Sequence, residues 1–314
     1  MKILFMGTPD FAKTILEALY TDGEEIVGVV TQPDKPKGRG YVLTPPPVKV
    51  YAESVSLPVY QPTTLKDGAF LPVLEELKPE LIIVAAYGKI LPKYILDYAV
   101  HGCVCAHASL LPRHRGAAPI QRSILAGDIE TGVTAMQMDE GIDTGDMLLY
   151  EKVAITSEDN FETVHDKLAV AGAIAIRRTV TAIKDGTLTA TPQPENDFPY
   201  AAKIERADCI LDFSADVRDV HNRIRGLSPV PLSQTKTPDG KLLKIVESVL
   251  LDETTDKTPG TVLSANAADG FFRVACGNGV IGICRLLPEG KGRMSAADFI
   301  RGRKIAVGDV LKYE

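Results

Sequence analysis

The sequence predicts a two-domain protein, in which a doubly wound, mostly parallel α/β sheet of the Rossmann type is followed by a small β-barrel of the OB type. The chain has 314 residues, about twice the size of an ordinary domain. Continuous apolar runs alternate with helical patterns in its first part, and short apolar runs separated by turn residues follow in its last third. We expect a first domain over residues 1–190, a linker over 191–204 and a second domain over 205–314.

The first elements expected are a strand, a turn and a helix. Residues 2–6 (KILFM) form a short apolar run that stops at a glycine, and apolar residues then recur at helical spacing from Phe11 to Leu19. Residues 25–31 (EIVGVVT) predict the next strand. The segment rich in Pro, Gly and Lys that follows as far as Pro47 predicts a long loop.

The middle of the chain completes the predicted sheet. Residues 81–86 (LIIVAA), 103–109 and 131–138 have the apolar character of buried strands. Ser157 predicts the N-cap of a helix that runs to Lys184, the longest expected in the chain. Prolines crowd the polar stretch that follows, which favours a linker.

The last third predicts the barrel. A helix is expected over residues 217–225, and short strands are expected over 242–249, 260–264, 271–275 and 280–287.

The composition excludes several classes of protein. Hydrophobic residues make up 45% and charged residues 24%, as in ordinary globular proteins. We expect a cytoplasmic protein without a membrane partner, because the sequence has neither a secretory signal pattern at its first residues nor an apolar run of membrane-spanning length. The 5 cysteines are an odd number without CxxC spacing, which argues against a disulfide framework and a zinc site.

Charge is distributed unevenly. The formal net charge is -6, which by itself argues weakly against a nucleic-acid partner. Residues 205–314 hold 16 basic and 15 acidic side chains, which leaves 19 basic and 26 acidic for residues 1–204, since the totals are 35 and 41. The second part is therefore relatively basic, as a part that faces a nucleic acid could be.

His107 and Asp143 are the candidate catalytic pair. Each follows closely on a predicted strand, where open α/β sheets place their sites. A histidine and a carboxylate that meet can exchange a proton near neutral pH, as acyl transfer to an amine requires. Spacing alone leaves a structural role open for both residues.

Motifs spread along the chain give this pair a context. The most specific is residues 107–121 (HASLLPRHRGAAPIQ), followed by residues 132–134 (GVT), 136–139 (MQMD) and 143–146 (DTGD). Shorter motifs are residues 7–12 (GTPDFA), 31–34 (TQPD), 38–40 (GRG), 47–49 (PVK), 259–261 (PGT) and 294–296 (MSA). Together they resemble the methionyl-tRNA formyltransferases, a 10-formyltetrahydrofolate-dependent family, over nearly the whole length.

The resemblance implies a reaction. The formyl group of 10-formyltetrahydrofolate would pass to the α-amine of methionyl initiator tRNA, for translation initiation, without a metal. His107 would protonate or stabilise the departing nitrogen and the oxyanion, and Asp143 would hold His107 in its charged form and help to remove the proton of the amine. We expect a monomer that binds folate and tRNA.

Cys105 departs from the pattern, because the family typically has asparagine two residues before this histidine. A thiol is a weaker hydrogen-bond donor than an amide, so the change could cost about 10²-fold to 10³-fold in rate. Three interpretations remain, in this order: other donors compensate, the enzyme is weakened, or Cys105 is a covalent nucleophile.

The resemblance also implies ligand-binding residues. Folate would contact three segments: Tyr87, Gly88, Ile90, Leu91 and Pro92; Ser109, Leu110, Leu111 and Pro112; and Asp139, Glu140, Gly141 and Ile142. The loop with Lys35, Lys37 and Arg39 would reach the RNA acceptor end, and the basic set Lys291, Arg293, Arg301, Arg303 and Lys304 would hold the tRNA stem through its phosphates. Both basic groups could instead be solvated surface.

Two other functions remain open. A formyltransferase could act on another amine, of a sugar or a glycinamide nucleotide. Alternatively, the chain could be a non-catalytic tRNA-binding homologue, with Cys105 as the mark of lost activity.

Overall fold

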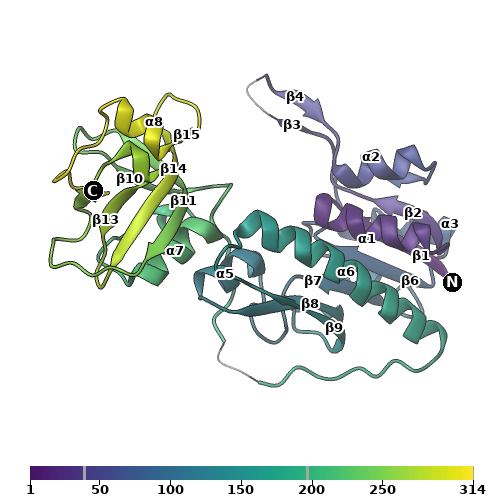
Figure 1. Cartoon of the computed structure of the whole chain (residues 1–314). Coiled ribbons are helices and arrows are strands. Elements are labelled where there is room, and N and C mark those ends of the chain that lie inside the picture. Colours follow the sequence, from purple (N-terminus) through teal and green to yellow (C-terminus); the bar gives the residue numbers. More distant parts are fainter. Residues whose placement is uncertain (38–39, 196–197, 314) are drawn as a thin grey trace. The chain divides into compact units, whose positions relative to one another are not determined.

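The computed structural model describes residues 1–37, 40–195 and 198–313, which form two compact units (Figure 1). Unit 1 comprises Met1–Gly116, Glu130–Ala154 and His165–Ala201, and unit 2 comprises Ala117–Ile129, Ile155–Val164 and Ala202–Glu314. The segment expected to be a linker divides between them, because its residues up to Ala201 belong to unit 1.

A mostly parallel sheet forms the centre of unit 1. Its strand order is β5-β2-β1-β6-β7-β8-β9. The strands are β1 (Lys2–Gly7), β2 (Glu25–Val30), β5 (Val59–Tyr60), β6 (Leu81–Ala85), β7 (Cys103–His107), β8 (Glu130–Gln137) and β9 (Met147–Ala154). Neighbouring strands from β5 to β7 are parallel, whereas β8 and β9 pair antiparallel at one edge.

Helices cover both faces of this sheet. They are α1 (Asp10–Thr21), α2 (Pro47–Ser54), the short η1 (Lys66–Gly68), α3 (Leu71–Leu77), α4 (Lys93–Leu96) and α6 (Phe161–Lys184), of which α6 is the long helix in Figure 1. Leu4 and Met6 of β1 share an apolar cluster with Leu74 of α3 and Ile95 of α4. The alternate β1 residues are buried toward the opposite face, where α1 and α6 pack together. The doubly wound α/β fold is thereby confirmed.

Two local expectations in unit 1 were wrong. The segment predicted as one long loop contains a hairpin of β3 (Lys35–Lys37) and β4 (Val42–Thr44), which extends from the unit in Figure 1. Helix α6 begins at Phe161 and not just after Ser157. The Asn160 side chain accepts from the Thr163 amide, and the Thr163 hydroxyl accepts from the Asn160 amide, so the reciprocal cap forms at Asn160.

Unit 2 is built on an antiparallel sheet. Its strand order is β10-β11-β14-β13-β12, with β15 paired to β14. The strands are β10 (Ser233–Lys236), β11 (Leu242–Leu251), β12 (Val262–Ser264), β13 (Phe272–Ala275), β14 (Val280–Pro288) and β15 (Met294–Ser295). The helices are α5 (Pro119–Leu125), η2 (Ala207–Cys209), α7 (Val217–Gly226), η3 (Ala267–Asp269) and α8 (Ala296–Arg301). The expected small β domain is confirmed, whereas β10 was not predicted from the sequence.

The core of unit 2 lies between this sheet and its helices. Ile245 of β11, Ile283 of β14 and Phe272 of β13 are completely buried, and Ile224 of α7 and Phe299 of α8 pack into the same cluster. The α8 helix also contacts β14 and β15. No helix among the described residues combines the length and the apolar character needed to cross a membrane.

Candidate active site

The structure brings His107 and Asp143 together. His107 is the last residue of β7, at the carboxyl edge of the parallel strands, and its Nδ1 lies 3.5 Å from Asp143 Oδ2. Its Nε2 donates to the carbonyl oxygen of His114 at 3.0 Å. His107 is buried, so both ring nitrogens meet oxygen acceptors in a site with little water. A doubly protonated ring satisfies both acceptors, whereas a neutral ring satisfies one.

Asp143 is held in an unusual backbone conformation. Its φ is +55°, in the left-handed region that non-glycine residues seldom adopt. The carboxylate also accepts from the backbone amide of Gly116, at 2.8 Å from Oδ2. Gly116 has φ +123°, which glycine adopts without strain, and a Cβ there would lie 2.6 Å from the ring of Tyr200, so this position requires glycine.

Cys105 lies on β7 two residues before His107, paired in register with Val84 of β6 and Met136 of β8. Burial raises the pKa of the Cys105 thiol well above its usual range, and the negative charge of Asp143 raises it further. The side chain therefore stays a neutral thiol at physiological pH. This argues against the covalent interpretation, which requires a thiolate.

An ion pair links one segment expected to bind folate to the residue that directly follows another. Lys93 Nζ, at the start of α4, lies 3.2 Å from Glu140 Oε1 in the loop 139–142. The backbone between β6 and α4 presents an exposed Gly88 and an exposed Ile90, while the other loop presents an exposed Ile142. Exposed apolar side chains are surfaces on which a flat heterocycle can pack.

Other members of these segments are engaged within the protein. Tyr87 is buried, and its carbonyl oxygen accepts hydrogen bonds from Thr8 Oγ1 and Gln32 Nε2. Burial raises the pKa of the Tyr87 hydroxyl to about 12. The Tyr87 hydroxyl has no hydrogen-bond partner in the part of the chain that the structure describes, which makes it a candidate ligand contact. Leu91 is buried too, and Pro92 is the N-cap residue of α4.

The segment 109–112 forms a tight turn after β7. The Ser109 hydroxyl donates to the Arg113 carbonyl at 2.7 Å, and the Thr134 hydroxyl joins the turn to β8 by donating to the Ser109 carbonyl and accepting from the Leu111 amide. Leu110 packs beside Gly132, and Pro112 follows a cis peptide bond. The loop 139–142 is also held by a side chain, because the Asp139 carboxylate accepts a hydrogen bond from the Gly141 amide.

The first basic group lies on the β3–β4 hairpin. Lys35 and Lys37 begin and end β3, and Arg39 lies outside the described residues. On the partner strand Val42 and Leu43 are exposed, as is Tyr41 before them. The hairpin thus presents apolar side chains next to lysine positions, a feature that the sequence pattern did not predict.

The second basic group lies on consecutive elements of unit 2. Lys291 and Arg293 are in the turn between β14 and β15, Arg301 ends α8, and Arg303 and Lys304 follow it. All five are exposed. The α8 helix contacts β15, so these elements are neighbours, and a basic surface for tRNA stays a prediction.

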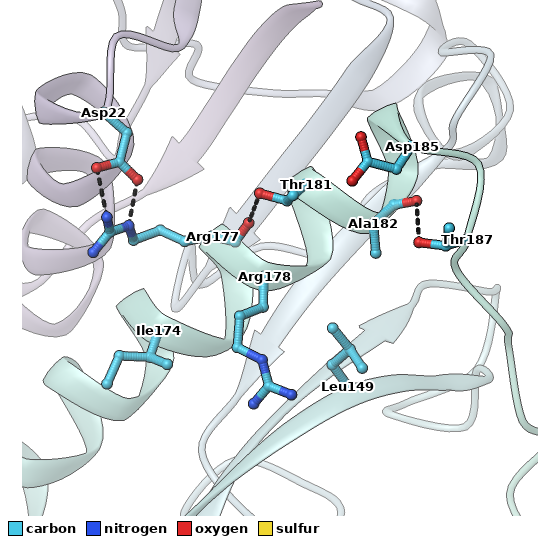
Figure 2. Close-up of a pocket in the computed structure, with 9 residues that line it drawn as sticks. All are labelled: Asp22, Leu149, Ile174, Arg177, Arg178, Thr181, Ala182, Asp185 and Thr187. Atoms are coloured by element: carbon cyan, nitrogen blue, oxygen red, sulfur yellow. Dashed lines mark hydrogen bonds and ion pairs between the residues drawn. The ribbon is translucent and has the colours of Figure 1, made fainter.

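A hollow in unit 1 lies elsewhere, between α6 and β9 (Figure 2). Its volume is about 510 Å³, and none of the residues lining it is a predicted site residue. Its two arginines are already paired, Arg177 with Asp22 and Arg178 with Glu151. We therefore place the chemistry at His107 and not in this hollow.

Comparison with known proteins identifies the family. Residues 1–180 match the family described as "Formyl transferase", and residues 203–304 match "Formyl transferase, C-terminal domain". The chain belongs to the formyl transferase family. It is 45% identical over 311 residues to the methionyl-tRNA formyltransferase of Syntrophus aciditrophicus, covering 99% of each chain, and 44% identical over 315 residues to that of Desulforamulus reducens. The recognised resemblance is thereby confirmed.

Solved structures share the fold. An N-formyltransferase from Helicobacter canadensis, in complex with folinic acid and dTDP-3-aminofucose, has a TM-score of 0.68 and 19% identity, and the match covers 90% of this chain and 99% of that one. HypX from Aquifex aeolicus in complex with tetrahydrofolic acid has a TM-score of 0.63 and 17% identity, over 100% of this chain. This formyl transferase spans about half the length of HypX, 51%.

One contact of the site escaped prediction. Gln193 bonds to the loop that carries Asp143, although it lies 50 positions further along the chain. It occurs in a polar, proline-rich stretch that has the composition of a linker. No local signal marks such a contact, because it depends on where the chain returns in space.

Proposed function

We propose that this chain transfers the formyl group of 10-formyltetrahydrofolate to the α-amine of methionyl initiator tRNA, as a cytoplasmic monomer. The observation that carries the proposal is the pair of the buried His107 and the half-buried Asp143, 3.5 Å apart at the carboxyl edge of the sheet. It occurs in a chain that matches methionyl-tRNA formyltransferases from end to end.

The proposed chemistry assigns one role to each side chain. The amine nitrogen attacks the formyl carbon to give a tetrahedral intermediate with an oxyanion. Collapse of this intermediate breaks the bond between the formyl carbon and the folate nitrogen and releases tetrahydrofolate. His107, as imidazolium, stabilises the oxyanion and gives a proton to the departing nitrogen, and the Asp143 carboxylate balances its charge and helps to take the proton of the amine. Ile90, Ile142 and the Tyr87 hydroxyl are the proposed surroundings of the folate ring.

A formylation assay tests the substrate. Purified protein with 10-formyltetrahydrofolate is given methionyl initiator tRNA, an amino sugar nucleotide, or glycinamide ribonucleotide. Formyl transfer only to the tRNA is the expected result. Transfer only to one of the others would replace the proposed acceptor, and tRNA binding without transfer would leave the non-catalytic interpretation.

The replacement Cys105→Asn is expected to change kcat by less than about tenfold, because backbone amides, His107 or water can donate to the oxyanion. Steady-state kinetics with saturating substrates measure this. A gain of about 10²-fold or more would contradict the compensated interpretation and favour a weakened enzyme. Cys284→Asn, on β14, is the matched control and should leave kcat unchanged.

We also propose that residues 205–314 form the tRNA-binding domain, with 1–190 as the catalytic domain. The double variant Arg301→Glu and Arg303→Glu is expected to raise the KM for tRNA about tenfold, since two phosphate contacts are lost. The slope of log KM against log salt should fall by roughly 1.5 to 2. The exposed Lys257→Glu is the control, and an equal effect there would reduce the result to net charge.

A further inference from the structure

The side-chain amide of Gln193 bonds to the loop of Asp143 through its nitrogen and to Arg115 through its oxygen. Its Nε2 donates to the carbonyl oxygens of Asp143, at 2.9 Å, and Gly145, at 2.7 Å. Its Oε1 accepts from Arg115 Nε at 2.8 Å. The reversed amide would set its oxygen against two carbonyl oxygens and its hydrogens against an N–H, so these three partners fix the orientation.

The loop requires such support. Asp143 has the left-handed φ of +55°, and a conformation of this kind persists only where its surroundings hold it. Its carboxylate reaches His107 while accepting from the Gly116 amide, so a small shift of the loop would break both contacts. Gln193 connects the two sides of this arrangement, because Arg115 immediately precedes Gly116.

The segment that carries Gln193 is itself fixed to unit 1. Thr191 and Met147, at the start of β9, exchange both backbone hydrogen bonds at 2.8 Å. On the other side, the Ala201 amide donates to the Arg115 carbonyl at 2.7 Å. Gln193 is therefore presented from a docked backbone, and its orientation costs little additional ordering.

We propose that Gln193 is a positioning residue that holds the Asp143 carboxylate against His107, a proposal that rests on the proposed function of that pair. Gln193 does not touch the reacting atoms. It acts through the two carbonyl groups that it binds, which set the backbone on each side of the carboxylate.

Two replacements of Gln193 remove different sets of its hydrogen bonds. Gln193→Leu removes all three, whereas Gln193→Glu keeps the acceptor for Arg115 but sets a carboxylate against two carbonyl oxygens. Both are expected to lower kcat by about tenfold to 10²-fold, with KM values unchanged within about twofold, because the loss is one of geometry. Thr189→Ala, exposed on the same segment, is the control and should behave as the parent protein.

Amide hydrogen exchange gives a readout that does not depend on activity. Faster exchange at Gly116 and at residues 143–146 in both variants, together with the lower kcat, supports the proposal. Unchanged exchange at these residues in the Gln193 variants overturns the proposal. Faster exchange with unchanged kcat also overturns it, provided that His107→Ala is inactive. Failure of the proposed function is seen separately, as full activity of His107→Ala. Melting curves identify a variant that has not folded, and the other variant then decides.

A double variant completes the test. In an Asp143→Ala background, Gln193→Leu should cause no further loss of single-turnover rate, because a residue that acts through Asp143 has nothing left to position. A further loss of tenfold or more would mean that Gln193 acts by another route, and would overturn the proposal.

Discussion

Replacing His107 by alanine is expected to lower kcat for formyl transfer by about 10²-fold to 10⁴-fold, the range that a general acid–base residue supplies. The reason is geometric, since the ring is buried at the end of β7 with its Nδ1 toward Asp143 and its Nε2 toward the His114 carbonyl. Water cannot easily replace a proton donor in that position. Single-turnover kinetics with excess enzyme measure the remaining rate.

The control for this variant is His101→Ala. His101 is an exposed histidine in the connection before β7, and it contributes its backbone amide to Glu80. The control should retain full activity. Asp143→Ala should resemble His107→Ala, because both break the same pair. Full activity in His107→Ala and Asp143→Ala together would remove the catalytic assignment.

The parts of the fold that follow from local pattern could be predicted from the sequence. Strands such as β1 and β6 are buried on both faces and therefore form uninterrupted apolar runs. The α1 helix buries one stripe and shows helical spacing. These patterns depend only on residues close together in the chain, so a single sequence is enough to predict these elements.

The edges of the fold were harder to predict. The β3–β4 hairpin has exposed side chains, so it lacks the alternation of a half-buried strand. The start of α6 was misplaced because Ser157 and Asn160 are both good N-cap residues, and the choice between them depends on which one meets Thr163. The hairpin and the first residue of α6 therefore depend on contacts in the folded chain and not on local sequence preference.

The candidate site, like the fold, could be predicted from the sequence only in part. Joining His107 to Asp143 depended on the resemblance, because their spacing alone did not require a contact. The contact between Gln193 and the Asp143 loop could not be predicted from the sequence, since a glutamine in a proline-rich stretch has no characteristic pattern. Residues that position a catalytic group are found by following hydrogen bonds outward from it, here through the Asp143 and Gly145 carbonyls.

Burial of Cys105 bears on the missing asparagine. Because burial and then Asp143 raise the thiol pKa, Cys105 brings no additional negative charge beside the oxyanion. A thiolate there would oppose the charge that forms on the formyl oxygen. A neutral, weakly donating side chain is therefore compatible with the proposed reaction, provided that another group donates to the oxyanion.

Replacing Gly145 by alanine is expected to lower kcat by about 10²-fold, because a displacement of about 1 Å near the chemistry has that effect. A Cβ at Gly145 would lie 1.7 Å from the Gln137 carbonyl oxygen, and backbone cannot move aside as a side chain can. The loop must shift, and it carries Asp143 two residues earlier. The unfolding free energy should fall by about 1–3 kcal/mol, as for other overpacked sites.

Gly292→Ala is the matched control, since no atom of the described residues lies within 4 Å of a Cβ at that turn. Steady-state kinetics and thermal melting of both variants separate the two effects of Gly145→Ala. A folded variant with a lower kcat and unchanged KM values places the loss in the geometry of the Asp143 loop. A variant that is destabilised yet keeps full kcat would contradict this account, because the reaction would then tolerate a displaced carboxylate.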